Sequence, residues 1–382
     1  MKGVDIKVNN KIILPVMLTN IRGFSHQAAL LAILLAHQEC RPWICNNFIQ
    51  IYTLKDLGMS ERQGTLDFYY MDYNDFKSYE YTVNPWIRWY EIPYSFWREK
   101  EDIIDCIIYN INHKCYLYLE VDTFYISAYD EYHSYHRIHW MYICGFDIDK
   151  REVFCFDNFS RGKFKLERIH FDEIKRGFEG SVNNYLLDKE SKTTENKWPG
   201  LGIFSITFTA ESKNSTDLLE INLNRIVCLL KDYLGWNKNR IAYMQSESYI
   251  FGIDSYNELI AIFQIVKGKN KKIDIRAFYS MKDHKSLMIW RILYLEQSLN
   301  IDLHSNKQTY IDLESKFQTV VALILKYNLS YKDTILIRAE NILTECKYRE
   351  KDCVIDLINR LGKKPLNLNH RKNVNSIKYK SI

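Results

Sequence analysis

The nine cysteines of this chain never occur in the Cys-x-x-Cys spacing that is typical of zinc sites and of thiol–disulfide oxidoreductases. Several of them lie inside apolar runs, as reduced and buried thiols do. The sequence also lacks an apolar signal core near its start, and its apolar run AALLAILLA is too short to span a bilayer. We therefore expect a soluble, cytoplasmic protein with no membrane partner.

An excess of charge of one sign is also missing. The formal net charge is +5 over 382 residues, which is too small to indicate nucleic-acid binding. The sequence contains neither a phosphate-binding loop nor a dinucleotide fingerprint. We expect no nucleic-acid partner and no bound cofactor, whereas an acidic protein partner remains open.

The sequence is rich in material for a core, since 47% of its residues are hydrophobic and 14% are aromatic. Between residues 12 and 178, an opening helix precedes short runs rich in β-branched and aromatic residues, which predict strands: CYLYLEVDTFYI, HWMYICGFDI and REVFCFDNF. Further on, apolar residues recur at three- and four-residue steps, as in amphipathic helices, in DLLEINLNRIVCLLKDYL and HKSLMIWRILYLEQSL. The predicted fold class is α+β.

Four segments follow from this pattern. Residues 1–180 are predicted to form the strand-rich domain and residues 201–362 a mainly helical domain. Residues 181–200 are polar and end in Pro-Gly, as a linker or surface loop does. Residues 363–382 carry six lysines and arginines and no acidic residue, which predicts a basic tail.

Three residues that are far apart in the chain have the chemistry of a nucleophilic triad. His139 begins one predicted strand and Asp157 lies near the end of the next, so antiparallel pairing would bring an imidazole and its orienting carboxylate together. Residues 23–28 read GFSHQA and open the first helix, where the helix dipole and free amides stabilise an anion. Ser25 occupies that position and is the candidate nucleophile.

This order resembles the papain-like fold of the bacteriocin-leader peptidases and, more closely, the N-terminal domain of the butirosin biosynthesis acyltransferase family. The resemblance extends beyond the triad to four further stretches and covers most of residues 12–300: LEVDTFYI, HSYHRIHW, FGIDSYNEL and IDIRAFYSMKDHKSLMIWRILYL. It implies a papain-like cysteine-protease fold, in which an N-terminal helix packs on an antiparallel sheet, followed by a mainly helical C-terminal region.

The resemblance also implies a function, which is amide-forming acyl transfer in specialised, nonribosomal-peptide-type metabolite assembly. An acyl group would pass from an acyl or peptidyl carrier-protein thioester to the nucleophile and then to an amine or diamine, as in the similar papain-like enzyme of closthioamide assembly. Phosphopantetheine would arrive on the carrier protein, so the enzyme itself needs no cofactor. An acidic carrier protein is compatible with the basic excess and the basic tail.

The sequence departs from the family at the nucleophile, because Ser25 stands where the family has cysteine. A thiolate–imidazolium pair forms readily at a helix N-terminus, whereas a serine hydroxyl needs base assistance during attack. Three interpretations stay open: an active serine nucleophile, the remnant of a catalytically dead homologue, or a deliberate cysteine-to-serine substitution that silences the enzyme.

Several residues have supporting roles or simpler structural explanations. Ser25 could instead cap its helix through the amides of Gln27 or Ala28. Asn158 could replace Asp157 as the orienting residue, and Asn20 or Thr19 could join the Ser25 amide in an oxyanion hole, with Asn20 the better amide donor. The remaining candidates are substrate-lining residues of the acyl site or its surroundings: Asp122, Tyr125 and His26.

Three histidines and two cysteines have side chains that can bind metals or act as nucleophiles, but their spacing does not indicate such a site. His133, His136 and His139 recur every third residue, but this segment leaves a loop and enters a strand, so we expect no metal. Cys40 and Cys45 are expected to be structural thiols. Two other functions remain as alternatives: a papain-like hydrolase, either peptidase or thioesterase, and a non-catalytic carrier- or acyl-binding pseudoenzyme.

Overall fold

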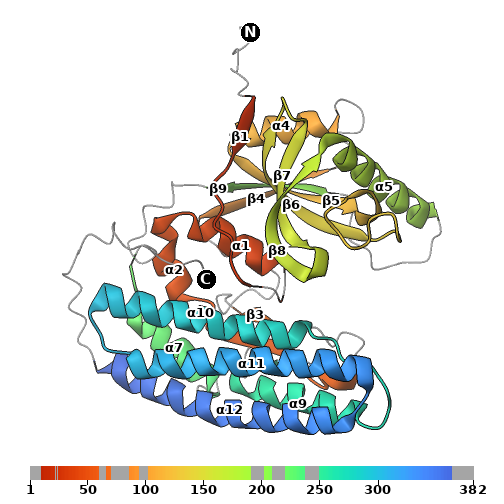
Figure 1. Cartoon of the computed structure of the whole chain (residues 1–382). Helices are drawn as coiled ribbons and strands as arrows, with labels where there is room; N and C mark the ends of the chain where they lie inside the picture. Colours follow the sequence, from red (N-terminus) through yellow and green to blue (C-terminus); the bar gives the residue numbers. More distant parts are fainter. Residues whose placement is uncertain are drawn as a thin grey trace. The chain divides into compact units, whose positions relative to one another are not determined.

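In a computed structural model, the protein is mixed α+β, with antiparallel sheets and a helical C-terminal region (Figure 1). The structure describes residues 10–21, 23, 25–59, 66–69, 86–93, 102–190, 202–208, 220–236 and 249–363. Two compact units divide the chain between them: unit 1 is residues 1–19, 25–38 and 79–214, and unit 2 is residues 20–24, 39–78 and 215–382.

Unit 1 is built on one antiparallel sheet. Its strands follow the order β4 (Ile87–Pro93), β9 (Gly202–Phe208), β5 (Cys115–Asp122), β6 (Ile138–Asp147), β7 (Glu152–Phe159) and β8 (Lys163–His170), and β1 (Lys11–Ile13) pairs with the end of β6. At Gly145 of β6 a Cβ would meet the Ile12 carbonyl oxygen at 2.4 Å, so the close approach of β1 requires glycine there. The strands β5, β6 and β7 coincide with the three runs that the sequence predicts as strands.

Within the described residues, the helices that accompany this sheet are α1 (Ser25–Leu35), α4 (Ile103–Asn112) and α5 (Phe171–Glu190). Every residue from 27 to 35 of α1 is buried, which explains why this helix is apolar on all sides instead of amphipathic. The side chain of Asp102 accepts a hydrogen bond from the Ile104 amide at 3.0 Å and so caps α4. Helix α1 packs against β7, while α4 and α5 pack against β5.

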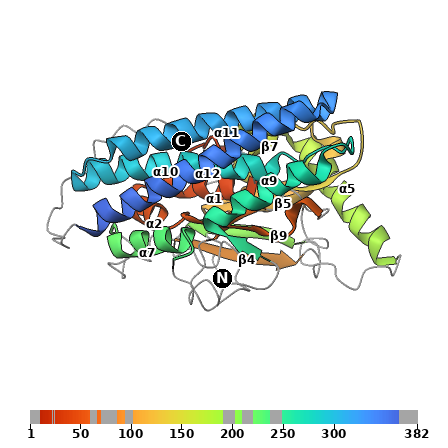
Figure 2. The ribbon, with the colours of Figure 1, turned by 90° about the horizontal axis from the view of Figure 1, so that it is seen from below.

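Unit 2 combines helices with a small antiparallel sheet of order β10 (Tyr249–Phe251), β2 (Gln50–Leu54) and β3 (Leu66–Tyr69). Its helices are α2 (Arg41–Asn46), α7 (Leu223–Tyr233), α9 (Ser255–Val266), α10 (Arg276–Leu299), α11 (His304–Ser330) and α12 (Asp333–Gly362). The long helices α10, α11 and α12 lie side by side in both ribbon views (Figures 1 and 2), and α11 contacts both neighbours. The described residues of the two units also contain short 3-10 turns: η1 (Gln38–Cys40), η2 (Leu57–Met59), η3 (Thr123–Tyr125), η4 (Ser160–Gly162) and η6 (Gly252–Asp254).

The core of unit 2 contains a hydrogen-bonded cluster of ionisable side chains. The Lys285 ammonium on α10 lies 2.6 Å from Oε2 of Glu350 on α12, and neither side chain is exposed. The Tyr256 hydroxyl donates to the same carboxylate oxygen at 2.6 Å. His284 donates from Nε2 to the Ile49 carbonyl oxygen at 2.9 Å and accepts from Lys285 at Nδ1 at 3.1 Å. These contacts join α10 and α12 to the β2 region.

The two units do not follow the predicted segment boundaries. Residues 39–78 belong to unit 2 because β2 pairs with β10 and because Arg291 of α10 donates to the Cys45 carbonyl oxygen at 2.8 Å. In the predicted linker, α5 continues to Glu190, and β9 then returns to the unit 1 sheet between β4 and β5. Residues 191–200 and 364–382, which include nearly all of the predicted basic tail, lie outside the described residues.

Candidate active site

His139 and Asp157 form a hydrogen-bonded pair on one face of the unit 1 sheet. The His139 Nε2 atom lies 2.8 Å from Oδ2 of Asp157. The Asp157 side chain is completely buried, whereas 23% of the His139 side chain is exposed. A buried carboxylate that orients a solvent-reaching imidazole has the geometry of the base half of a nucleophilic triad.

The strand register explains why these two side chains meet. Tyr142 of β6 pairs with Phe156 of β7. Side chains alternate between faces along a strand, so His139, three residues before Tyr142, and Asp157, one residue after Phe156, share the opposite face. The turn between the strands is closed by the Arg151 amide, which donates to the Ile148 carbonyl oxygen at 3.1 Å. The pairing of adjacent strands thus brings together the two residues that the sequence analysis singles out.

The hydrogen bond fixes the roles of the two imidazole nitrogens. The carboxylate accepts from Nε2–H, so a neutral His139 carries its lone pair on Nδ1. That nitrogen is the one able to take a proton from a nucleophile. The pair therefore has the tautomer that general-base catalysis through Nδ1 requires.

Tyr129 is a third member of this group that the sequence analysis missed. Its hydroxyl donates to Oδ2 of Asp157 at 2.6 Å, and the residue is only 4% exposed. Burial and the negative charge of Asp157 raise the pKa of Tyr129 well above its ordinary value, so the phenol stays protonated and acts as a donor. The other carboxylate oxygen, Oδ1 of Asp157, is buried and has no hydrogen-bond partner among the described residues.

Ser25 is the first residue of α1 and is half-buried. Its backbone amide is one of the N-terminal amides for which an α-helix offers no internal partner. The capping of α1 by the Ser25 hydroxyl through the Gln27 or Ala28 amide stays a prediction. Because α1 packs against β7, the strand that carries Asp157, the candidate nucleophile and the His139–Asp157 pair belong to the same unit.

The two candidate oxyanion donors before α1 differ in their surroundings. The Thr19 hydroxyl is buried and makes no hydrogen bond within the described part of the chain. Asn20 is exposed and belongs to unit 2. The oxyanion role of either side chain stays a prediction.

Asp122 and Tyr125 lie on the other face of the sheet from the pair. Val121 of β5 pairs with His139, so Asp122, the next residue, points to the opposite face. The Asp122 carboxylate accepts from the Phe124 amide at 3.1 Å and so begins the η3 turn. Both side chains lie against Gly180 of α5, where an added Cβ would meet each of them at 2.9 Å. Neither residue is a neighbour of Asp157.

The three regularly spaced histidines do not converge on one point. His136 bonds through Nδ1 to Asp122 Oδ2 at 2.6 Å, whereas His139 bonds to Asp157 on the other face. The ring of His133 stacks on Tyr132 at 4.0 Å. Among the described residues, no group of three or more histidines, cysteines or acidic residues could hold a metal ion.

The remaining candidates, Asn158 and His26, are both half-buried. Asn158 is half-buried and follows Asp157 in β7, so its side chain points to the face opposite the pair. His26 is the second residue of α1 and is half-buried.

The cysteines have the properties of structural thiols. No disulfide forms among the nine, all of which lie in the described ranges, and seven of them are buried. Burial raises the pKa of Cys45 to about 12, and burial followed by the charge of Glu39 raises the pKa of Cys40 even further. Neither thiol is therefore a ready source of thiolate at neutral pH.

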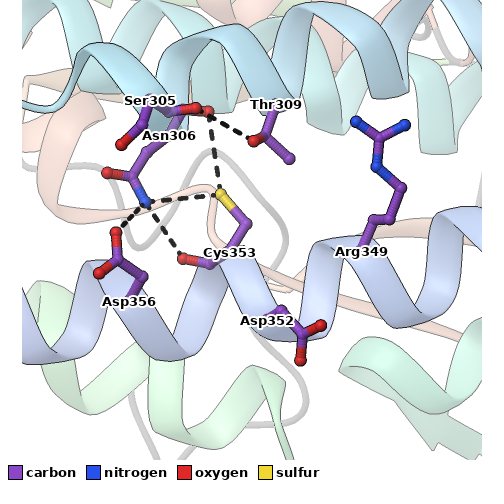
Figure 3. Close-up of a pocket in the computed structure, with 7 residues that line it drawn as sticks. All are labelled: Ser305, Asn306, Thr309, Arg349, Asp352, Cys353 and Asp356. Atoms are coloured by element: carbon purple, nitrogen blue, oxygen red, sulfur yellow. Dashed lines mark hydrogen bonds between the residues drawn. The ribbon is translucent and has the colours of Figure 1, made fainter.

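A separate cavity of about 260 Å³ lies in unit 2, on α11 and α12 (Figure 3). Two of its polar side chains are bound by neighbours: Asn306 Nδ2 donates to Asp356 at 3.0 Å, and Arg349 pairs with Asp312 and Glu345. This cavity has no part in the His139–Asp157 arrangement. It is lined by Ser305, Asn306, Thr309, Arg349, Asp352, Cys353 and Asp356.

Across the part of the chain that the structure describes, no helix combines the length and apolar character that a membrane span requires. No protein-family model and no curated protein matches this chain.

Proposed function

We propose that this protein is a papain-like acyltransferase that forms amides from a carrier-protein thioester and an amine. The observation that carries the proposal is the Nε2-to-carboxylate bond of His139 and Asp157, in the same unit as a helix that begins at Ser25. The order of these residues along the chain supports the proposal, because it resembles that of the butirosin acyltransferase family. The antiparallel sheet with its buried N-terminal helix agrees with this family's architecture.

The reaction would proceed through an acyl-enzyme. The residue 25 nucleophile attacks the thioester carbonyl carbon while His139 Nδ1 takes its proton, and the C–S bond breaks as the pantetheine thiol leaves with that proton. The amine then attacks the acyl-enzyme carbonyl, His139 takes a proton from the amine nitrogen, and the proton returns to the residue 25 oxygen or sulfur as its bond to the acyl carbon breaks. The products are an amide and the regenerated nucleophile.

The positive end of α1 would stabilise the oxyanion that forms in both steps. Backbone amides in the first turn of a helix have no internal acceptor, and the helix dipole favours a negative charge there. The Ser25 amide is the first of these donors. The carrier protein and a small amine or diamine are the partners in this proposal, and phosphopantetheine enters on the carrier protein.

The identity of the nucleophile decides how active this chain is. A serine hydroxyl does not ionise near neutral pH, so Ser25 depends fully on His139 for deprotonation, whereas a thiol in the same place would ionise more readily. The same serine supports the second candidate, a carrier- or acyl-binding pseudoenzyme. A hydrolase would use the same acyl-enzyme but would pass the acyl group to water.

The test compares the parent chain, which has Ser25, with Ser25→Cys and with Ser25→Ala as the control. Each is incubated with an acyl-loaded carrier protein, with and without a diamine, and its intact mass is measured. We expect the cysteine variant to gain the acyl mass and to release an amide when the diamine is present, whereas Ser25→Ala gains nothing. Free acid formed at the same rate with and without amine would support the hydrolase, and no loading of any form would contradict the acyl-enzyme proposal.

A further inference from the structure

Tyr129 is placed where it can control the base of the candidate active site. Its hydroxyl and the His139 Nε2–H donate to the same oxygen, Oδ2 of Asp157, at 2.6 Å and 2.8 Å. The Tyr129 ring also lies edge-on to the His139 ring, with centroids 5.6 Å apart and an angle of 86° between the planes. One side chain therefore contacts both members of the pair.

The loop that carries Tyr129 is fixed to the end of β7. The Tyr129 ring packs on Phe159, with centroids 4.9 Å apart. Both the amide and the hydroxyl of Ser160 donate to the Ala128 carbonyl oxygen, at 3.0 Å and 2.7 Å. The Tyr129 amide itself donates to the Ile126 carbonyl oxygen at 3.2 Å. The hydroxyl is thus held by the backbone around it as well as by its own bond.

The bond has a defined chemical consequence for the carboxylate. The Tyr129 phenol stabilises the Asp157 carboxylate more strongly when His139 is neutral than when His139 is protonated, because a protonated imidazole already compensates part of the negative charge. Tyr129 thereby favours the neutral imidazole, the form that can accept a proton. It also occupies one lone pair of Oδ2, which leaves the imidazole a single direction from which to donate.

We propose that Tyr129 is a positioning residue that holds the Asp157 carboxylate and keeps His139 in its neutral, Nδ1-basic form; its catalytic consequence rests on the proposed function, but its effect on His139 does not. Tyr129 touches no reacting atom in this scheme and acts only through Asp157. The other ionisable groups that act on Tyr129 are Cys155 of β7, whose pKa is raised by burial, and Arg137, which directly precedes β6 and pairs with Glu131.

The experiment follows the titration of the His139 imidazole by NMR in the parent chain and in Tyr129→Phe. Removing the Tyr129 hydroxyl destabilises the state with neutral His139 more than the state with protonated His139. The His139 titration midpoint should therefore move to higher pH by roughly half a unit to one unit. The matched control is Tyr116→Phe, which also removes the hydroxyl of a buried tyrosine, in this case with a 2.6 Å bond to the Pro15 carbonyl oxygen. The control should lose stability without moving the His139 midpoint.

A second variant covers the case in which Tyr129→Phe does not fold. Replacement of Tyr129 by 3-fluorotyrosine keeps the shape and makes the phenol a stronger donor, so the midpoint should move to lower pH. An unchanged midpoint in the folded variants, or a shift equal to that of Tyr116→Phe, would overturn the proposal. Since no substrate is involved, a midpoint that moves as expected in a chain that never becomes acylated supports this inference while the acyltransferase proposal fails.

Discussion

At the scale of single residues, the buried carboxylate of Asp157 has one oxygen that accepts two hydrogen bonds and one oxygen with no partner among the described residues. A carboxamide at this position would keep the shape but could donate as well as accept. It would then allow the His139 ring to expose the wrong nitrogen to the nucleophile, because nothing would require a proton on Nε2.

Asp157→Asn should therefore slow acylation of the Ser25→Cys protein by about a hundredfold or more, with the fold retained. The rate of mass gain with an acyl-carrier substrate measures this effect. Asp147→Asn, a change at a second buried carboxylate near the other end of the same strand pair, should leave the rate close to that of its parent. Equal losses in the two variants would mean that the effect is structural.

His284 gives a residue-scale prediction for stability. Burial, and after it the positive charge of Lys285, lower the pKa of His284 well below 6.5, in keeping with its role as an acceptor at Nδ1. The unfolded chain takes up this proton below about pH 6.5 and the folded chain does not, so the free energy of unfolding should fall as the pH decreases. The slope contributed by His284 is up to about 1.4 kcal/mol per pH unit.

Urea unfolding at several pH values between 7.5 and 4.5 measures this slope. In His284→Gln, whose carboxamide can still donate to the Ile49 carbonyl oxygen, the loss of stability in acid should be smaller by that amount. His304→Gln, at an exposed position at the start of α11, should keep the parent's pH dependence. A His284→Gln curve that runs parallel to the parent's would contradict the assignment of His284 as the proton-excluding group.

At the scale of elements, the contact between α10 and α12 depends on a charge pair instead of apolar packing alone. Lys285 and Glu350 are completely buried, and each is stabilised chiefly by the presence of the other. Removing one partner leaves the other charge uncompensated in the core, whereas replacing both by apolar residues leaves no buried charge without a partner.

Lys285→Met alone should accordingly lower the free energy of unfolding by about 3–5 kcal/mol. The double variant Lys285→Met, Glu350→Leu should recover a large part of that loss. A double-mutant cycle measured by urea denaturation gives the coupling between the two positions. Losses that simply add would show that the pair has no interaction energy beyond its separate contacts.

How far the sequence predicts these elements depends on the range of the interactions. Alternation in REVFCFDNF and the turn before it are local, so β6, β7 and the meeting of His139 with Asp157 could be predicted. Tyr129 lies in a loop with no periodic pattern, and only the folded chain shows that its hydroxyl reaches Asp157. The strand β9 lies within the predicted helical domain but pairs in the unit 1 sheet, and its partners, β4 and β5, are about a hundred residues earlier, beyond the range of any local pattern.

At the scale of the whole molecule, each unit is assembled from three separate segments of the chain. A fragment of residues 1–180 lacks β9, which lies between β4 and β5 in the sheet, and it also contains residues 39–78 without the elements of unit 2 that they pair with. Composition and periodicity describe each stretch by itself, so they cannot show this interleaving.

We expect residues 1–180, produced alone, to give a poorly dispersed amide NMR spectrum and to unfold without a cooperative transition. The full chain should give a dispersed spectrum and cooperative unfolding under the same conditions. Residues 1–214, which restore β9 but not β10, should be intermediate. A well-dispersed spectrum of the 1–180 fragment would instead support the boundary that the sequence predicts.

The interleaved path of the chain also limits how such a protein can be recombined. A single genetic crossover near residue 215 would deliver the long helices of a donor together with the recipient's β2, the strand to which the donor's β10 must pair. The incoming helices would meet a foreign residue at position 49, where the His284 imidazole needs a carbonyl oxygen, and a foreign stretch at 45–47, where the Arg291 guanidinium binds main-chain oxygens. The acceptors at 45, 47 and 49 are backbone oxygens, which every sequence supplies. The limit on recombination is therefore the backbone path of these residues, and hybrids that preserve this path should tolerate exchange of the side chains there.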